Sequence, residues 1–452
     1  MTESENIVIL EAENAELRQQ IISLEEKVLL LLELQQKQRV KKDSGNSSLP
    51  PSSDIGRKTG SLRQRSGRSP GGQKGHRGNT LEMTATPDRI IDLKSNYCAA
   101  CGNRLGDENF VLKARRQVLE IPPSQPIIEE YRTFACACPK CDYEQIADFP
   151  PAVKAPIQYG SSVQALVAYF SVYQYVPFRR LKNLFSEVFK LPLSEGTLVN
   201  LLEKSAEKSG FVYAGIKAEI GESRVVGSDE TSARVDGKKW WMWVWQNVLN
   251  TFIVAAESRG SRTIEAEWSQ GLQGATVVSD RWAAQLKMPS AGKQICLAHL
   301  LRDVRYLAEV EKEEFSVRFK RLLGTVFEIR QEMVRTNAPC EKEKAEELEN
   351  QMNNLLAISI NREKKPETAR FQRSMIKYRN NLLPCLYDVE IPADNNGSER
   401  AIRNIKVKQK ISGQFKGGQK TFCVLRSVID TLIKRQLDVL THLTQIMKIQ
   451  PE

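Results

Sequence analysis

The order of strand-like and helix-like segments between residues 224 and 302 constrains the fold of this chain most. Residues 225–235 alternate like a strand and run into Asp236-Gly237, a dipeptide typical of a tight hairpin. Periodicity predicts strands at 225–235, 239–246, 251–257, 275–280 and 294–299, with helices at 262–270 and after Asp280. Three antiparallel strands followed by helix, strand, helix and strand are typical of a ribonuclease H-like sheet.

Carboxylates occupy two comparable places in this expected sheet. The first and fourth strands should be neighbours, so Asp229 on the first and Asp280 ending the fourth should face each other. A third acid arriving on a late helix, Glu399, would complete a triad. Carboxylate oxygens suit magnesium or manganese rather than zinc, and two such ions can serve phosphodiester displacement. The sequence therefore predicts a two-metal carboxylate site.

Each acid also has a plainer interpretation. Asp280 can cap the helix that follows it, and Asn396-x-x-Glu399 fits a capping box at a helix start. The nearest rival ligands are Glu230 and Asp394.

Two further features lie close to the expected site. His299, one of three histidines, is either an active-site participant or a hydrogen-bonded core residue. The tryptophans of the second strand are expected to pack in the core, the alternative being a platform for stacked bases. These are Trp240, Trp241, Trp243 and Trp245.

Heptad repeats mark the N-terminus. The apolar and polar positions that recur every seven residues are Ile7, Asn14, Ile21 and Val28 in one set and Leu10, Leu17, Leu24 and Leu31 in the other. Leucine at every d position with mostly β-branched residues at a favours a parallel two-stranded coiled coil, and a buried asparagine fixes register. We therefore expect a homodimer joined through residues 1–40, the alternative being an amphipathic helix packed on its own domain.

The nine cysteines point to metal ligation rather than disulfides. Cys98-x-x-Cys101 and Cys138-x-x-Cys141 each resemble a zinc knuckle, and together they predict a structural zinc held by four thiolates. Strand-like segments at 111–121 and 127–135 would fill the gap between the pairs. Cys136 is a rival fourth ligand.

Positive charge is concentrated in two stretches. The net charge is +11, and residues 37–78 and 400–435 each carry a net +9. This pattern predicts a nucleic-acid partner. The expected DNA-binding residues are Arg57, Lys58, Arg63, Arg65, Arg68, Lys74 and Arg77 in a flexible linker, and Arg400, Arg403, Lys406, Lys408 and Lys410 on a late helix.

Other regions narrow the class of protein. Residues 160–208 read as helices, and 178–202 fit either a helix-turn-helix or an ordinary αα-hairpin. No apolar stretch approaches the roughly 20 residues that a membrane span needs, and the acidic N-terminus does not resemble a secretory signal. We expect a cytoplasmic protein.

Taken in order, the motifs resemble the transposases of the insertion-sequence-66 type over nearly the whole chain. They are the zipper, Asn46-Ser-Ser-Leu-Pro-Pro-Ser-Ser-Asp54, Pro70-Gly-Gly-Gln-Lys-Gly-His-Arg-Gly78, the paired cysteines, Ser228-Asp-Glu-Thr231, Arg234-Val-Asp-Gly237, Val278-Ser-Asp280, Cys296-x-Ala-His299-x-x-Arg302 and Asp394-Asn-Asn-x-x-Glu-Arg-Ala401. The chain departs from the family pattern in ending soon after its final helix and in carrying Cys136.

This resemblance implies a DDE transposase whose triad is Asp229, Asp280 and Glu399. Such an enzyme cleaves a phosphodiester at each element end and joins the freed 3′-hydroxyl to target DNA, using two magnesium or manganese ions. Its partners would be terminal inverted repeats, target DNA and accessory proteins of the same element. The alternatives are a non-catalytic zinc-containing DNA-binding regulator on an inactive ribonuclease H-like scaffold, and a nuclease that cuts without joining.

The expected architecture is multidomain α+β. Its parts are a leucine-zipper coiled coil at 1–40, a basic DNA-binding linker at 41–90, a zinc-ribbon-like module at 91–150, a helical DNA-binding region at 151–215, a ribonuclease H-like core at 216–302, a helical insertion at 303–388 and the C-terminal part of the catalytic domain at 389–452.

Overall fold

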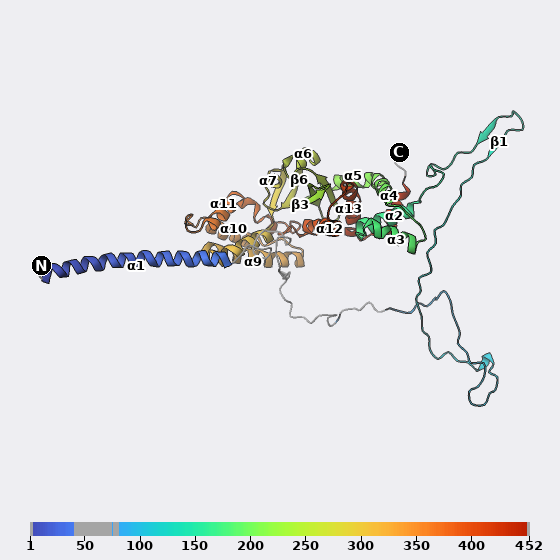
Figure 1. The fold of residues 1–452 in the computed structure, drawn as a ribbon, viewed down its shortest axis with the longest axis horizontal. Coiled ribbons are helices and arrows are strands. Elements are labelled where there is room, and N and C mark those ends of the chain that lie inside the picture. Colours follow the sequence, from blue (N-terminus) through green and yellow to red (C-terminus); the bar gives the residue numbers. More distant parts are fainter. Residues whose placement is uncertain (1–2, 40–74, 76–80, 450–452) are drawn as a thin grey trace.

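The computed structural model describes residues 3–39, 75 and 81–449 (Figure 1). Within helix α1, side chains are described for residues 13–32. The heptad residues Ile7 and Leu10 therefore lie outside the described side chains. The predicted DNA-binding residues Arg57, Lys58, Arg63, Arg65, Arg68, Lys74 and Arg77 lie outside the described residues altogether.

A mixed five-stranded sheet forms the centre of the body, in the order β5-β4-β3-β6-β7. Its strands are β3 (Val225–Val235), β4 (Lys238–Gln246), β5 (Thr251–Ala256), β6 (Leu272–Ser279) and β7 (Ser290–Ile295). The first three strands pair antiparallel, whereas β3 with β6 and β6 with β7 pair parallel. The predicted adjacency of the first and fourth strands of this sheet is confirmed.

The β3–β4 hairpin turns where the sequence predicted it. Asp236 and Gly237 adopt φ values of 47° and 76°, both in the left-handed region that a type I′ turn requires. The fifth predicted strand was wrong at its end, because β7 stops at Ile295 and the backbone turns helical. The amide N–H of Leu300 donates to the carbonyl oxygen of Cys296, so His299 lies in the first turn of a helix.

Tryptophan packing at β4 explains why this strand is central. Trp243 and Trp245 are fully buried, and their rings stack with centroids 5.7 Å apart. Trp240 and Trp241 are only partly buried against the same core. Helices α5 (Gly210–Gly221) and α13 (Gln419–Lys434) pack against β5, and α12 (Asn396–Ser412) packs against β3 and β4.

A second apolar core lies among the helices between β7 and α12. These helices are α8 (Leu297–Val310), α9 (Glu314–Thr336), α10 (Lys342–Leu356) and α11 (Pro366–Lys377). The rings of Phe315, Phe319 and Phe371 contact one another in it. Arg330 of α9 donates to the carbonyl oxygens of Cys385 and Val389 and so fixes the segment that leads back toward α12.

Preceding the sheet, a helical group packs against α13. It comprises α2 (Ser161–Ala168), the π-helical turn η3 (Tyr169–Tyr173), α3 (Phe178–Val188) and α4 (Glu195–Lys208), and α14 (Val439–Lys448) joins it from the C-terminal end. The hydroxyl of Ser194 caps α4 by accepting the N–H of Thr197 at 3.0 Å. Phe185 of α3 and Leu198 of α4 are buried in the main core. This burial is compatible with both the helix-turn-helix and the αα-hairpin predictions.

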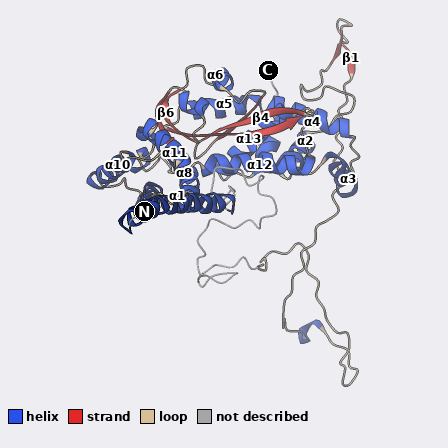
Figure 2. Cartoon of the chain, turned by 60° about the vertical axis from the view of Figure 1, so that its left-hand side comes forward, coloured by secondary structure: helices blue, strands red, loops and turns tan. Residues whose placement is uncertain are grey.

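Residues 81–150 form long extended arms beside the body (Figures 1 and 2). The strands predicted at 111–121 and 127–135 were wrong. The only paired strands in these arms are the three-residue β1 (Ala135–Ala137) and β2 (Glu144–Ile146). Val111, Ile121 and Ile127 are each close to nine-tenths exposed. These residues have high β propensity, but no neighbouring strand pairs with them, and propensity alone does not form a strand.

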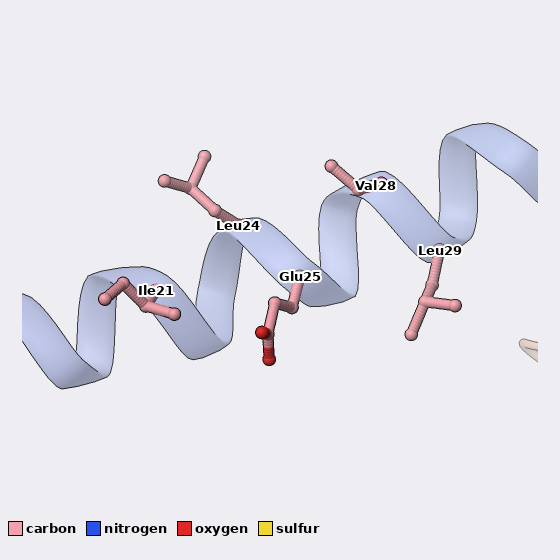
Figure 3. A pocket seen from close by; sticks show the side chains of 5 residues that line it. All are labelled: Ile21, Leu24, Glu25, Val28 and Leu29. Carbon is pink, nitrogen blue, oxygen red and sulfur yellow. The ribbon is translucent and has the colours of Figure 1, made fainter.

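Helix α1 (Glu3–Arg39) contacts α8 and projects its N-terminal end away from the body (Figure 1). Figure 3 shows Leu24 and Val28 on one side of this helix, beside Ile21. The described apolar heptad side chains Leu17, Ile21, Leu24, Val28 and Leu31 are all more than half exposed. Within the described residues, no helix is both long enough and apolar enough to cross a bilayer.

Candidate active site

The register of two parallel strands brings the first two acids together. Gly227 of β3 pairs with Val278 of β6. Asp229 and Asp280 each lie two residues beyond this pair, so both reach the same edge of the sheet. The amide N–H of Glu230 donates to Oδ1 of Asp229 at 2.8 Å and holds this carboxylate in place.

Helix α12 reaches this edge through an unusually close approach to β3. A Cβ atom on Gly227 would lie 2.7 Å from Oγ of Ser398, and one on Gly397 would lie 2.5 Å from Nε2 of Gln246. The Asn395 side chain holds the start of the helix against β3 by donating a hydrogen bond to the carbonyl oxygen of Ser228 at 2.8 Å. The first turn of α12, with Glu399 on it, is thereby held beside the two aspartates.

Neither plain capping interpretation matches the structure. The N-cap of α12 is Asn395, without a side-chain cap, and Glu399 N–H donates to the Asn395 carbonyl oxygen rather than to Asn396. Likewise α7 (Ala283–Lys287) has Trp282 as its N-cap and takes no side-chain cap from Asp280. Both acids are therefore free of the helix-start roles that their sequence contexts suggested.

His299 lies between Asp280 and Glu399. Its Nδ1 is 2.9 Å from Oδ1 of Asp280, and its Nε2 is 3.7 Å from Oε1 of Glu399. The first contact is an ion pair when the imidazole is protonated. Burial lowers the pKa of His299, but its contacts with Asp280 and Cys296 outweigh burial and raise the pKa to about 10. The imidazole joins two acids that come from distant parts of the chain.

Negative charge is concentrated at Asp229. Burial raises the pKa of Asp229 well above its ordinary value, and the nearby charges of Asp280 and Glu230 raise it further. Carboxylates crowded together in a buried place are characteristic of sites that take a cation.

The two rival acids have other partners. The Glu230 side chain is 4% exposed, and its Oε1 lies 2.7 Å from an Arg259 guanidinium nitrogen. Gln285 Nε2 donates to its other oxygen at 2.7 Å. Asp394 accepts the N–H of Asn396 at 3.0 Å, one turn before Glu399. The predicted ligand set of Asp229, Asp280 and Glu399 therefore stays a prediction, with Glu230 tied to Arg259 and Gln285.

Three residues of this site received no role from the sequence. They are Cys296, whose sulfur lies 3.3 Å from His299 Nδ1, Arg302, which lies 3.4 Å from Glu399 Oε1, and Asn395. The spacing Cys296-x-x-His299-x-x-Arg302 was a usable signal, because residues three apart share a helix face. Nothing in the sequence around Asn395 marks its bond to β3.

The basic residues of α12 divide into two groups. Arg400, Arg403 and Lys410 are exposed. Lys406 instead donates to the carbonyl oxygen of Ser232 at 2.8 Å, and burial lowers the pKa of both Lys406 and Lys408. Three of the five predicted DNA-binding residues on this helix are thus exposed to solvent, while Lys406 contributes to the packing of α12 on β3.

The two cysteine pairs form matching turns. Cys98 N–H donates to Asn103 and Cys138 N–H donates to Tyr143, at 2.8 and 2.9 Å. Gly102 and Asp142 follow the pairs with φ values of 71° and 52°. Backbone N–H groups, first those of Ala100 and Lys140, lower the pKa of the Cys98 and Cys138 thiols. Each turn thus has the form that supplies two of the four thiolates of a structural zinc site.

The structure does not bring these two turns together. Among the described residues, the cluster of potential metal ligands within 4.8 Å of one another is Asp280, Cys296 and His299, not the four knuckle cysteines. Cys136 lies on β1 and its sulfur contacts the Ala137 carbonyl oxygen, outside the second turn.

Three family models match parts of this chain. A model described as the IS66 transposase family matches residues 156–420, more than half of the 452 residues. The zinc-finger binding domain of IS66 transposases matches residues 95–142, and a family of unknown function matches residues 3–82. No curated protein matches the chain. With its mixed sheet, its many helices and its zinc-finger segment, the chain belongs to the IS66 family of transposases.

Proposed function

We propose that this chain is an active DNA transposase whose catalytic centre is the triad of Asp229, Asp280 and Glu399. The observation that carries the proposal is that Asp280, after β6, and Glu399, on the first turn of α12, both face His299. Asp229 lies beside them on β3, which pairs parallel with β6. The sheet order, with its first and fourth strands paired parallel, supports a ribonuclease H-like catalytic domain.

The donor set fits magnesium or manganese. All three acids supply hard oxygen ligands. Burial first, and then the charges of Asp280 and Glu230, raise the pKa of Asp229, and a bound cation would offset both effects. Two such ions, when bound, would activate the attacking oxygen and stabilise the leaving oxygen of a phosphodiester displacement. The reaction would be cleavage at the element ends, followed by attack of the freed 3′-hydroxyl on target DNA.

The chain's own residues position this site. The Glu230 N–H orients Asp229, and the Arg302 guanidinium orients Glu399. His299 fixes the separation of Asp280 from Glu399. The exposed Arg400, Arg403 and Lys410 would attract DNA phosphates toward the triad, together with the basic residues of the 41–90 linker.

Two further proposals concern assembly. The exposed heptad side chains of α1 support a parallel coiled coil that joins two copies of the chain. The matching cysteine turns, within the zinc-finger match, support one structural zinc held by Cys98, Cys101, Cys138 and Cys141 once the two arms meet.

The test is a joining assay with linear DNA that carries the element's terminal inverted repeats, a supercoiled target and magnesium. The proposal predicts joined products that disappear when the metal is chelated. Cleavage without joining would identify a nuclease, and binding without cleavage would identify a DNA-binding regulator on an inactive scaffold. Either result would overturn the proposal.

A further inference from the structure

The cluster of Asp280, Cys296 and His299 has a donor set that magnesium does not prefer. The His299 Nδ1 lies 2.9 Å from Asp280 Oδ1 and 3.3 Å from Cys296 Sγ, and all three ligand atoms lie within 4.8 Å of one another. Ligands on a tetrahedral zinc ion are separated by about 3.3–3.6 Å. A carboxylate, a thiolate and an imidazole are ligands that zinc takes readily, whereas a thiolate is a poor ligand for magnesium.

Neighbouring groups support these three side chains as metal ligands. The backbone N–H of Asn395 donates to Cys296 Sγ at 3.3 Å, a bond that would stabilise a thiolate. The second nitrogen of His299 faces the Glu399 carboxylate at 3.7 Å. A carboxylate behind the free nitrogen of a histidine is the usual support for a zinc-bound imidazole. Asp280 Oδ1 faces the same His299 nitrogen at 2.9 Å and would be the third ligand once zinc replaced the imidazole proton.

We infer that Asp280, Cys296 and His299 form a second zinc site, which overlaps the catalytic triad and switches it off when filled. Zinc would take Asp280 directly and would hold Glu399 through His299, so two of the three acids would be committed to it. Divalent zinc binds mixed nitrogen, oxygen and sulfur sites far more tightly than magnesium does. The inhibitory consequence rests on the proposed function, whereas the binding site itself does not.

Metal stoichiometry tests the site without any DNA. Zinc per chain is measured for the full-length protein after equilibration at low free zinc. The Cys296→Ser variant, which keeps an acceptor for the Asn395 N–H, should bind one zinc fewer than the wild type. Cys423→Ser, at a buried cysteine whose sulfur contacts Met242, is the matched control and should bind as many as the wild type.

Cobalt provides a second readout that does not depend on one variant. In the difference spectrum between wild type and Cys296→Ser, a thiolate-to-cobalt charge-transfer band should remain after the contribution of the knuckle cysteines cancels. His299→Asn should lose the same band if Cys296→Ser fails to fold. Equal zinc stoichiometry and identical cobalt spectra in folded variants would overturn the inference.

The joining assay then tests the consequence. With magnesium in excess, added zinc should abolish joining by the wild type. For Cys296→Ser, the ratio of the joining rate without zinc to the rate with zinc should be much smaller. Equal inhibition of both proteins would reject the switch. If the wild type joins no DNA at all, the proposed function fails, while stoichiometry and spectra still decide whether the zinc site exists.

Discussion

At the scale of single residues, the site depends on contacts that hold each acid against the backbone or against a positively charged side chain. Arg302 is an example, because its guanidinium lies 3.4 Å from Glu399 and its side chain is 14% exposed. Replacing it by glutamine removes a charge-assisted contact of about 1.5–3 kcal/mol, which corresponds to roughly a tenfold to hundredfold loss of joining.

The matched control for Arg302→Gln is Arg318→Gln. Arg318 forms an ion pair with Glu314 on the exposed face of α9. This change should leave the joining rate near that of the wild type, since exposed helix pairs contribute little to stability. Equal losses in the two variants would show that Arg302 has no special role.

Gly227 tests the packing of α12 on β3. A Cβ atom there would meet Gln246 at 2.4 Å and Ser398 at 2.7 Å, so Gly227→Ala should lower the free energy of unfolding by about 1–3 kcal/mol. It should also shift Glu399 and reduce joining. Gly274→Ala on neighbouring β6, where a Cβ meets nothing within 4 Å, is the control. Denaturant midpoints measure both, and an unchanged midpoint for Gly227→Ala would contradict this packing argument.

At the scale of elements, the cysteine turns and α1 make separate predictions. Cys138→Ser removes a ligand at a formed turn and should lose the zinc bound by the 95–142 segment. Cys136→Ser should retain it, because Cys136 lies on β1 outside the turn. Zinc content after mild chelation measures both variants. Loss of zinc only from Cys136→Ser would make Cys136 the true fourth ligand.

For α1, replacing Leu17 and Leu24 with glutamate should convert a dimer to a monomer, because two charges would enter the heptad seam. Leu29 and Leu30 are similarly exposed but lie off that seam, so glutamates there should disturb the dimer less. Sedimentation equilibrium distinguishes the outcomes, and a wild-type monomer would remove the coiled-coil proposal.

Sequence periodicity predicted these elements unevenly. The strand that carries Asp229 and the strand that ends just before Asp280 were predictable, because alternation and a type I′ turn are local signals. The segments at 111–121 and 127–135 share that propensity but lack a partner, and pairing is a property of the whole fold. The close contact between Gly227 of β3 and Ser398 of α12 links residues about 170 apart in the sequence, so no local pattern predicts it.

At the scale of the whole molecule, the helices α8 to α11 separate the second acid from the third in sequence and return the chain to the site. Arg330 contributes to that return through its bonds to the carbonyl oxygens of Cys385 and Val389. Arg330→Met would remove the donor from one buried and one partly buried carbonyl, at about 1–3 kcal/mol each. We expect lower stability together with weaker joining, measured by thermal unfolding and the joining assay, and an unchanged melting temperature would count against this view.

The central claim is that Asp229, Asp280 and Glu399 act together as metal ligands for joining. The direct measurement compares the joining rates of Asp229→Asn, Asp280→Asn and Glu399→Gln with that of Asp236→Asn, whose hairpin position tolerates asparagine at positive φ. Each triad variant should lose at least about a hundredfold, because several kcal/mol of metal-mediated stabilisation are removed. Asp236→Asn should join at the wild-type rate. Wild-type joining by any folded triad variant would contradict the claim.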